Sequence, residues 1–264
     1  MREIRKGYVD ATGGQIHYHS VAGSEPAIIF LHQTASSARS YDPLLEALTL
    51  PNRLIALDTP GFGNSADLGL WPSLQDYAAF VVEAADALSI SRFHLFGHHT
   101  GATLAIEIAA AWPEGVLSLM LSGPVFMTVE EQARFIEHYE APISPVRDGS
   151  HLATNWGYAA SNNPTCAVDL LQDAVVDLLH AWRARPKAYM AVARHDTAAR
   201  ARDVHIPTLL LTAPGDFFYE TFDRARAIFP KATVATTAGD NFQATADPQG
   251  VAAAIQDFLG AARL

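Results

Sequence analysis

Residues 95–104 read LFGHHTGATL, which is a short apolar run, two glycines four positions apart and the start of a helical pattern. This order predicts a strand that breaks sharply into a helix between Gly97 and Gly101. Glycine suits such a turn because the strand and helix backbones pass too close there for a Cβ atom. His99 stands at the apex. We expect its side chain to project above the sheet edge, beside the free N–H groups of the first helical turn.

Composition narrows the class of protein and of partner. The chain has 264 residues, of which 49% are hydrophobic, so it can bury the core of one α/β domain with an insertion. Its net charge of −10 argues against nucleic acid and anionic membrane surfaces as partners. The predicted partner is a neutral or weakly charged small-molecule substrate, and a homodimer is left open.

The ends and the cysteine content give no sign of secretion. The first residues lack an apolar signal core, and no run approaches the ~20 apolar residues of a membrane span. The single cysteine, Cys166, excludes an intramolecular disulfide. We therefore expect a soluble, cytoplasmic protein that does not insert in a membrane.

Strand and helix patterns alternate along most of the chain. Continuous apolar runs are typical of parallel strands that are buried on both faces. Their alternation with helical patterns predicts a parallel sheet wound by right-handed crossovers. Two alternating runs at residues 4–9 and 15–20 predict a hairpin at an antiparallel edge. The predicted buried strands are residues 27–31, 53–57, 93–96, 116–121 and 207–212.

Three motifs together resemble the α/β-hydrolase superfamily. One buried strand ends at His32, and the next is closed by residues 58–65, DTPGFGNS. The turn GHHTG at residues 97–101 then resembles the Gly-x-Ser-x-Gly nucleophile elbow of that superfamily, without its serine. The resemblance covers residues 4–260 and implies an α/β-hydrolase fold, a mostly parallel central sheet flanked by helices with an inserted helical cap.

The alternation stops between Pro124 and His205, where helical periodicity is interrupted by proline- and asparagine-containing joints. The resemblance implies a cap at this place in the chain. We therefore predict a first part of the core at residues 1–124, the helical cap at 125–205 and a second part of the core at 206–264.

The resemblance also locates the positions of the catalytic triad. It places the acid at Asp216, after the strand that follows the cap, and the triad histidine at Asn241, before the terminal helix. No histidine follows His205. His99 and Asn241 thus replace the serine and the histidine, and the usual acyl-serine mechanism cannot run with these residues.

We predict that His99, Asp216 and Asn241 are the catalytic residues. In this hypothesis the Asn241 amide donates to Asp216 and its carbonyl accepts from the His99 imidazole. His99 then faces the cavity as a general acid or base.

Further candidates surround this group. The resemblance implies oxyanion donors at the backbone N–H of Thr100 and at that of Gln33 or Thr34, and the Gln33 amide could bind a substrate oxygen. His32 is a candidate for substrate binding, or else a structural histidine that ties loops together. Cap aromatics can line the pocket or pack the cap's own core. The cap residues considered for the pocket are Trp156, Tyr158, Trp182, Tyr189 and His195.

No metal and no cofactor is predicted. His98 and His99 are neighbours at a strand end, so their side chains point in different directions, and no third ligand has i, i+4 spacing. The two glycines are too few for a dinucleotide-binding loop.

Three functional classes remain. The main prediction is a cofactor-independent enzyme of small-molecule metabolism that uses His99 as acid or base: a lyase, isomerase, cyclase or C–C bond-cleaving enzyme. The first alternative is a hydrolase of an ester, lactone or C–C bond, in which His99 activates water or accepts the acyl group. The second is a catalytically silent protein that binds a small molecule.

Overall fold

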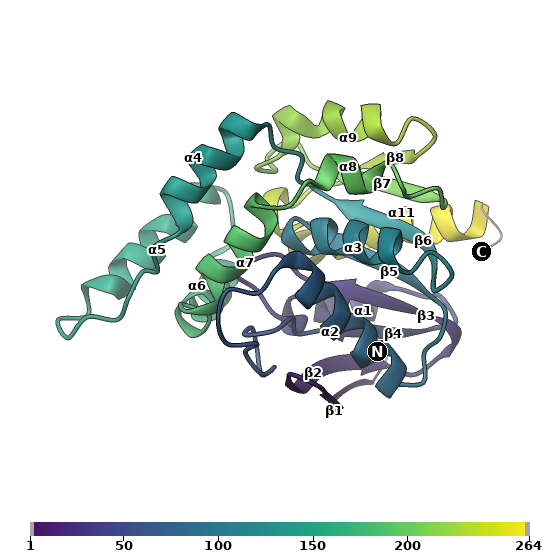
Figure 1. The fold of residues 1–264 in the computed structure, drawn as a ribbon, viewed down its shortest axis with the longest axis horizontal. Helices are drawn as coiled ribbons and strands as arrows, with labels where there is room; N and C mark the ends of the chain where they lie inside the picture. The colour runs from purple at the N-terminus through teal and green to yellow at the C-terminus, as the bar shows by residue number, and fades with distance from the viewer. Residues whose placement is uncertain (1–2, 262–264) are drawn as a thin grey trace.

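A computed structural model of the chain describes residues 3–261, and its centre is a mostly parallel sheet of eight strands (Figure 1). The strand order is β1-β2-β4-β3-β5-β6-β7-β8. β2 pairs antiparallel with β1 and β4, and the other pairs are parallel, so the predicted hairpin at the edge is confirmed. The strands are β1 Ile4–Ala11, β2 Gly14–Val21, β3 Ser24–Leu31, β4 Asn52–Leu57, β5 Phe93–His98, β6 Val116–Ser122, β7 Thr208–Thr212 and β8 Thr233–Thr236.

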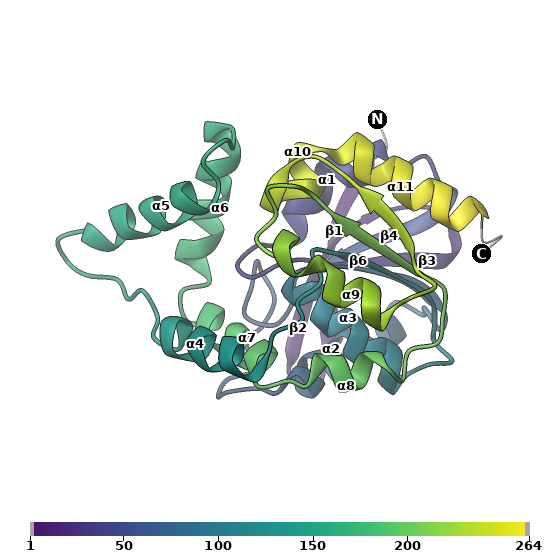
Figure 2. The same cartoon turned by 90° about the horizontal axis from the view of Figure 1, so that it is seen from above.

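Helices cover both faces of this sheet (Figures 1 and 2). Side chains alternate between the faces of a strand, so Ile28 and Phe30 of β3 pack on one side and Ile29 and Leu31 on the other, all fully buried. Continuous apolar runs thus supply both cores. α1 and α11 cover one face, and α2, α3 and α9 cover the other. The helices of the core are α1 Asp42–Ala47, α2 Leu74–Ala87, α3 Thr100–Ala111, α9 Phe222–Ile228, α10 Gln243–Ala246 and α11 Pro248–Ala261.

Between β6 and β7 every element of secondary structure is a helix, as expected for a cap. Figure 2 shows α4 to α7 projecting to one side of the sheet, whereas α8 lies against the core helix α3. None of the helices within residues 3–261 has the length and apolar content needed to cross a membrane. The helices of this segment are α4 Val129–Tyr139, α5 Ser150–Asn162, α6 Val168–His180, α7 Ala184–Ala193 and α8 Thr197–Ala201.

The turn at His99 has the predicted strand-to-helix geometry. β5 ends at His98 and α3 begins at Thr100, and His99 between them has φ 47° and ψ −107°, a backbone conformation that is costly for a residue with a side chain. A Cβ on Gly97 would lie 2.2 Å from the carbonyl oxygen of Gly101. A Cβ on Gly101 would lie 2.0 Å from the carbonyl oxygen of Leu31. The two glycines therefore allow α3 to pack directly on the sheet.

Replacing Gly101 tests this close approach. We expect Gly101→Ala to lower the free energy of unfolding by about 3 kcal/mol or more, because the methyl group meets backbone atoms that cannot move independently. Urea denaturation followed by circular dichroism measures the change. Gly157 is the matched control, since it lies in helix α5 with nothing within 4 Å of an added Cβ. Gly157→Ala should be neutral or stabilising by about 0.5–1 kcal/mol. Equal midpoints for Gly101→Ala and wild type would contradict the prediction.

Candidate active site

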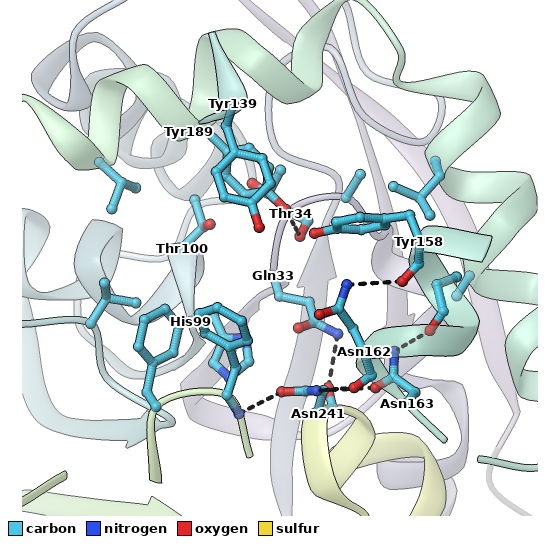
Figure 3. A pocket seen from close by; sticks show the side chains of 18 of the residues that line it. Gln33, Thr34, His99, Thr100, Tyr139, Tyr158, Asn162, Asn163, Tyr189 and Asn241 are labelled. Carbon is cyan, nitrogen blue, oxygen red and sulfur yellow. Dashed lines mark hydrogen bonds between the residues drawn. The ribbon is translucent and has the colours of Figure 1, made fainter. Parts of the chain in front are cut away.

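A cavity lies between the cap and the edge of the sheet where the parallel strands end (Figure 3). Its volume is about 830 Å³, including the open mouth. The elbow contributes His99 and Thr100, the loop after β3 contributes Gln33 and Thr34, and the cap contributes a roof of tyrosines. The tyrosines are Tyr139 on α4, Tyr158 on α5 and Tyr189 on α7.

His99 reaches the acid directly. Its Nε2 lies 2.8 Å from Oδ2 of Asp216, and the two side chains are 11% and 0% exposed. The amide of Gln243 donates to the same Oδ2 at 2.9 Å, and the N–H of Phe218 donates to Oδ1 at 2.8 Å. Burial alone would raise the pKa of Asp216, but His99, then His98 and the Phe218 N–H, outweigh it and lower the pKa to about 2. Asp216 is therefore a carboxylate at neutral pH.

Gly123 makes room for this pair. It follows β6, has φ +53°, and a Cβ on it would lie 2.5 Å from Nε2 of His99 and 2.8 Å from Oδ2 of Asp216. Any larger residue at position 123 would push the imidazole away from the carboxylate. Sequence reasoning missed this role, although a glycine directly after a buried strand at the carboxyl edge of the sheet is a usable signal.

The expected relay through Asn241 is not what the structure shows. Asn241 is the acceptor for Phe217 N–H at 2.8 Å, and its amide donates to Asn162 O at 2.9 Å and to Asn163 Oδ1 at 3.1 Å. Because a 3₁₀ turn at Asp240–Phe242 leads into α10, the side chain of Asn241 faces the cap. Gln243, two residues later, is fully buried against Asp216. The sequence prediction was wrong about which amide touches the acid.

Asn241 fastens the cap to the core instead (Figure 3). Its side chain binds the C-terminal end of cap helix α5 and the loop after β7. Its backbone oxygen also accepts the Gln33 amide at 2.9 Å. The Gln33 side chain, expected to be available for a substrate oxygen, is therefore engaged with the protein.

Backbone donors remain beside His99. Thr100 is the first residue of α3, so its N–H has no partner within the helix. The N–H groups of Gln33 and Thr34 find no acceptor among residues 3–261. All three residues line the cavity, which is the arrangement expected of an oxyanion hole.

Two other candidates lie outside this cavity. His32 is buried, with Nδ1 2.8 Å from the carbonyl oxygen of Gln33 and Nε2 accepting from Thr59 N–H at 3.1 Å. Burial lowers the pKa of His32, so it is a neutral structural residue that ties two loops together. Trp156 is on α5 and 38% exposed, and it does not line the cavity. The helical register turns Tyr158, and not Trp156, toward the cavity.

His195 also has a structural place away from the cavity. Its Nε2 lies 2.9 Å from Glu107 on α3, and its Nδ1 lies 3.0 Å from Thr197 Oγ1. Arg200 donates to the same buried Glu107 at 2.8 and 3.2 Å. This network holds the end of the helical segment on the core, and the prediction of a pocket role for His195 was wrong.

One set of side chains could hold a metal ion. Among residues 3–261, His98, His99 and Asp216 are the only such group, each offering a ligand atom within 4.8 Å of the others. Burial, then the neighbouring His99, lowers the pKa of His98 far below its usual value, so it is neutral, as a metal ligand must be. Nε2 of His98 is buried without a hydrogen-bond partner. A metal bound here would replace the His99–Asp216 hydrogen bond, and the absence of a metal stays a prediction.

The fold agrees with the comparison to known families. The sequence profile of the family described as serine aminopeptidase, S33, matches residues 23–237. The chain belongs to this α/β-hydrolase family. The turn between β5 and α3 of this member reads Gly97-His98-His99-Thr100-Gly101.

Relatives among characterised proteins are mainly hydrolases. A 2-hydroxy-6-oxononadienedioate/2-hydroxy-6-oxononatrienedioate hydrolase of Burkholderia vietnamiensis is 31% identical over 43% of this chain and 41% of its own length. The dihydrolipoyllysine-residue acetyltransferase component of the acetoin cleaving system of Cupriavidus necator is 30% identical over 45% of this chain and 32% of its own length. The chain thus matches less than half the length of these relatives.

Solved structures show the fold over the whole chain. A hydrolase from Pseudomonas aeruginosa PA01 superposes with a TM-score of 0.81 at 20% identity, covering 97% of this chain and 98% of that one. The predicted α/β-hydrolase fold is confirmed, and most of the relatives of the chain are hydrolases by name.

The lowered pKa of Asp216 predicts that the stability of the fold decreases at acid pH. A carboxyl group whose pKa falls from 3.8 to about 2 on folding stabilises the fold above pH 4, and this contribution is lost as the pH falls toward 2. Between pH 5 and pH 2 the free energy of unfolding of the wild type should fall by about 2 kcal/mol more than that of Asp216→Asn. Urea denaturation at several pH values measures it.

Asp257→Asn, which changes an exposed carboxylate on α11, is the control and should follow the wild type. Equal losses of stability in the wild type and in Asp216→Asn would show that the buried carboxylate does not contribute in this way.

Proposed function

We propose that this protein hydrolyses an ester or lactone bond of a small molecule, with His99 as the general base that activates water. The observation that carries the proposal is the 2.8 Å contact between His99 Nε2 and Asp216 Oδ2. Asp216 accepts the proton of Nε2, so the neutral imidazole keeps its lone pair on Nδ1. Within residues 3–261 Nδ1 has no partner, and it is not among the atoms buried without one, so it is open to the cavity.

The steps follow from these positions. Nδ1 takes a proton from a water molecule as the water oxygen attacks the substrate carbonyl carbon. Asp216 stabilises the imidazolium that forms, and the carbonyl oxygen gains negative charge beside the free N–H groups of Thr100 and of the Gln33–Thr34 loop. When the tetrahedral intermediate collapses, the imidazolium returns the proton to the leaving alkoxide. One water is consumed, and an acid and an alcohol are formed.

Attack by the imidazole itself is the less favoured route. An acyl-imidazole would have to be cleaved by water, and that water would need a second base. Of the described residues that line the cavity, His99 is the only one with an imidazole or a carboxylate. A single base therefore fits direct attack by water better than a covalent intermediate.

Hydrolysis has more support than the lyase or isomerase chemistry first expected. The family is one of hydrolases, and two of the three relatives described above are hydrolases by name, one of them acting on a 2-hydroxy-6-oxo dicarboxylate. The cavity keeps the free backbone donors that stabilise a carbonyl oxygen, and these donors do not depend on the serine. A C–C bond next to a carbonyl is a further substrate for the same base and oxyanion site.

The test is the hydrolysis of 4-nitrophenyl esters and simple lactones. We expect His99→Ala to lower kcat/KM by about 10²- to 10⁴-fold, the usual contribution of a general base. His99→Ser should recover nothing, because Asn241 occupies the position expected for the triad histidine. A fluorophosphonate, which needs an activated serine, should leave the wild type active.

His180→Ala, at an exposed histidine of cap helix α6, is the control for contaminating esterases and should retain full activity. Unchanged turnover in His99→Ala, or no hydrolysis of any ester or lactone by the wild type, would refute the proposal.

A further inference from the structure

The cap contains a buried arginine among aromatic rings. Arg185 is on α7 and only 7% exposed. Its guanidinium carbon lies 4.2 Å from the centre of the Tyr158 ring, 5.5 Å from that of Tyr189 and 5.8 Å from that of Tyr139. These are the three tyrosines that form the roof over His99. The cation therefore lies directly behind the wall of the proposed active site.

This guanidinium has no anionic partner among the described residues. Among residues 3–261 it forms no ion pair with a carboxylate, and its Nε is buried without any hydrogen-bond partner. Burial works against its charge, and the hydroxyls of Tyr189 and Tyr158 outweigh this effect and keep the pKa of Arg185 above its usual value. Ring faces attract the cation but do not satisfy its five N–H donors. A buried charge without a counterion costs free energy, so an external anion is the expected complement.

A second cavity gives that anion a place. Arg185 lines a hollow of about 620 Å³, including its mouth, together with Asn155, Trp182 and apolar side chains. Tyr139, Tyr158 and Leu178 line both this cavity and the one at His99. The two cavities thus lie on either side of one thin, mostly aromatic wall.

We propose that Arg185 is the binding site for the carboxylate of a small organic acid. A planar guanidinium matches a carboxylate with two parallel hydrogen bonds. One cation among aromatic and aliphatic walls suits a single negative charge on a carbon chain. A phosphate dianion would need further cations, which the described residues around this cavity do not provide beyond the exposed His138.

The carboxylate can come from two sources. It can be the far end of the substrate, reaching past Tyr139 and Tyr158 from a carbonyl held at His99, and this source rests on the proposed hydrolase function. It can also be a separate small acid that binds behind the tyrosines and supports the roof of the active site. Both sources use the same chemistry at Arg185.

A binding experiment tests the site without relying on catalysis. Hexanoate is the probe and 1-hexanol its neutral counterpart, both at constant ionic strength, with isothermal titration calorimetry and thermal unfolding as readouts. We expect hexanoate, and not hexanol, to bind the wild type and raise its Tm. Arg185→Gln should weaken hexanoate binding by about 10- to 100-fold. Arg183→Gln removes an exposed charge from the same segment and should bind like the wild type.

If Arg185→Gln does not fold, Arg185→Lys tests the site in its place. This variant keeps the positive charge but loses the planar pair of donors. It should bind hexanoate several-fold more weakly than the wild type. Equal binding of hexanoate by the wild type and by the available Arg185 variant, or no binding by the wild type, would overturn the proposal.

Kinetics separate the two sources. Monomethyl adipate carries a free carboxylate and dimethyl adipate does not. If the carboxylate belongs to the substrate, the wild type should prefer the monoester by about 10-fold or more in kcat/KM, and Arg185→Gln should lose this preference. Equal rates for the two esters, with hexanoate still bound at Arg185, identify a separate acid. If neither ester is cleaved, the hydrolase proposal fails while the binding experiment still decides the anion site.

Discussion

The hydrogen bond between His99 and Asp216 depends on a backbone that is packed too tightly for side chains. His99 is held at a positive φ because its N–H donates to Ser122 O at 3.0 Å and its carbonyl accepts from Ala102 and Thr103 in the first turn of α3. That conformation aims the imidazole across the ends of β5, β6 and β7. Gly97 and Gly101 let α3 pack directly on the sheet, and Gly123 removes the Cβ atom that would lie in the path of the imidazole. The chemistry of the site therefore rests on backbone contacts more than on side-chain packing.

The sequence allowed the sheet and the elbow to be predicted because both have strong local signals. Central parallel strands need continuous apolar runs, and the turn at His99 needs glycines on either side. The position of Asp216 followed from its place after the strand that returns from the cap. What could not be predicted was the partner of each polar group. Asn241 and Gln243 are two residues apart in a loop of short turns, where no periodicity fixes which of them faces the acid.

The partners of two buried histidines could not be predicted from the sequence either. His32 and His195 had plausible roles in a pocket, but their partners are Thr59 and Glu107, far from them in sequence. Only the fold brings these groups together. In the cap, aromatic content indicated a lined pocket, yet the rotation of α5 decides that Tyr158 faces inward while Trp156 is exposed. Arg185 gave no sequence signal, because an arginine in a helix is normally on the surface.

The environment of Asp216 decides how protons can move in this site. Oδ2 accepts from both His99 and Gln243, and Oδ1 accepts from the Phe218 N–H, so each oxygen is occupied by donors. A carboxylate satisfied in this way is a poor proton acceptor and serves to hold charge and orientation. Gln243 is held in turn by the hydroxyl of Thr237 at 2.7 Å, which fixes its amide as the donor toward the acid. In the proposed mechanism, proton transfer to and from the substrate then passes through Nδ1 of His99. In that mechanism, an elbow histidine paired with a fixed carboxylate thus supplies a base beside an oxyanion site and needs no covalent nucleophile.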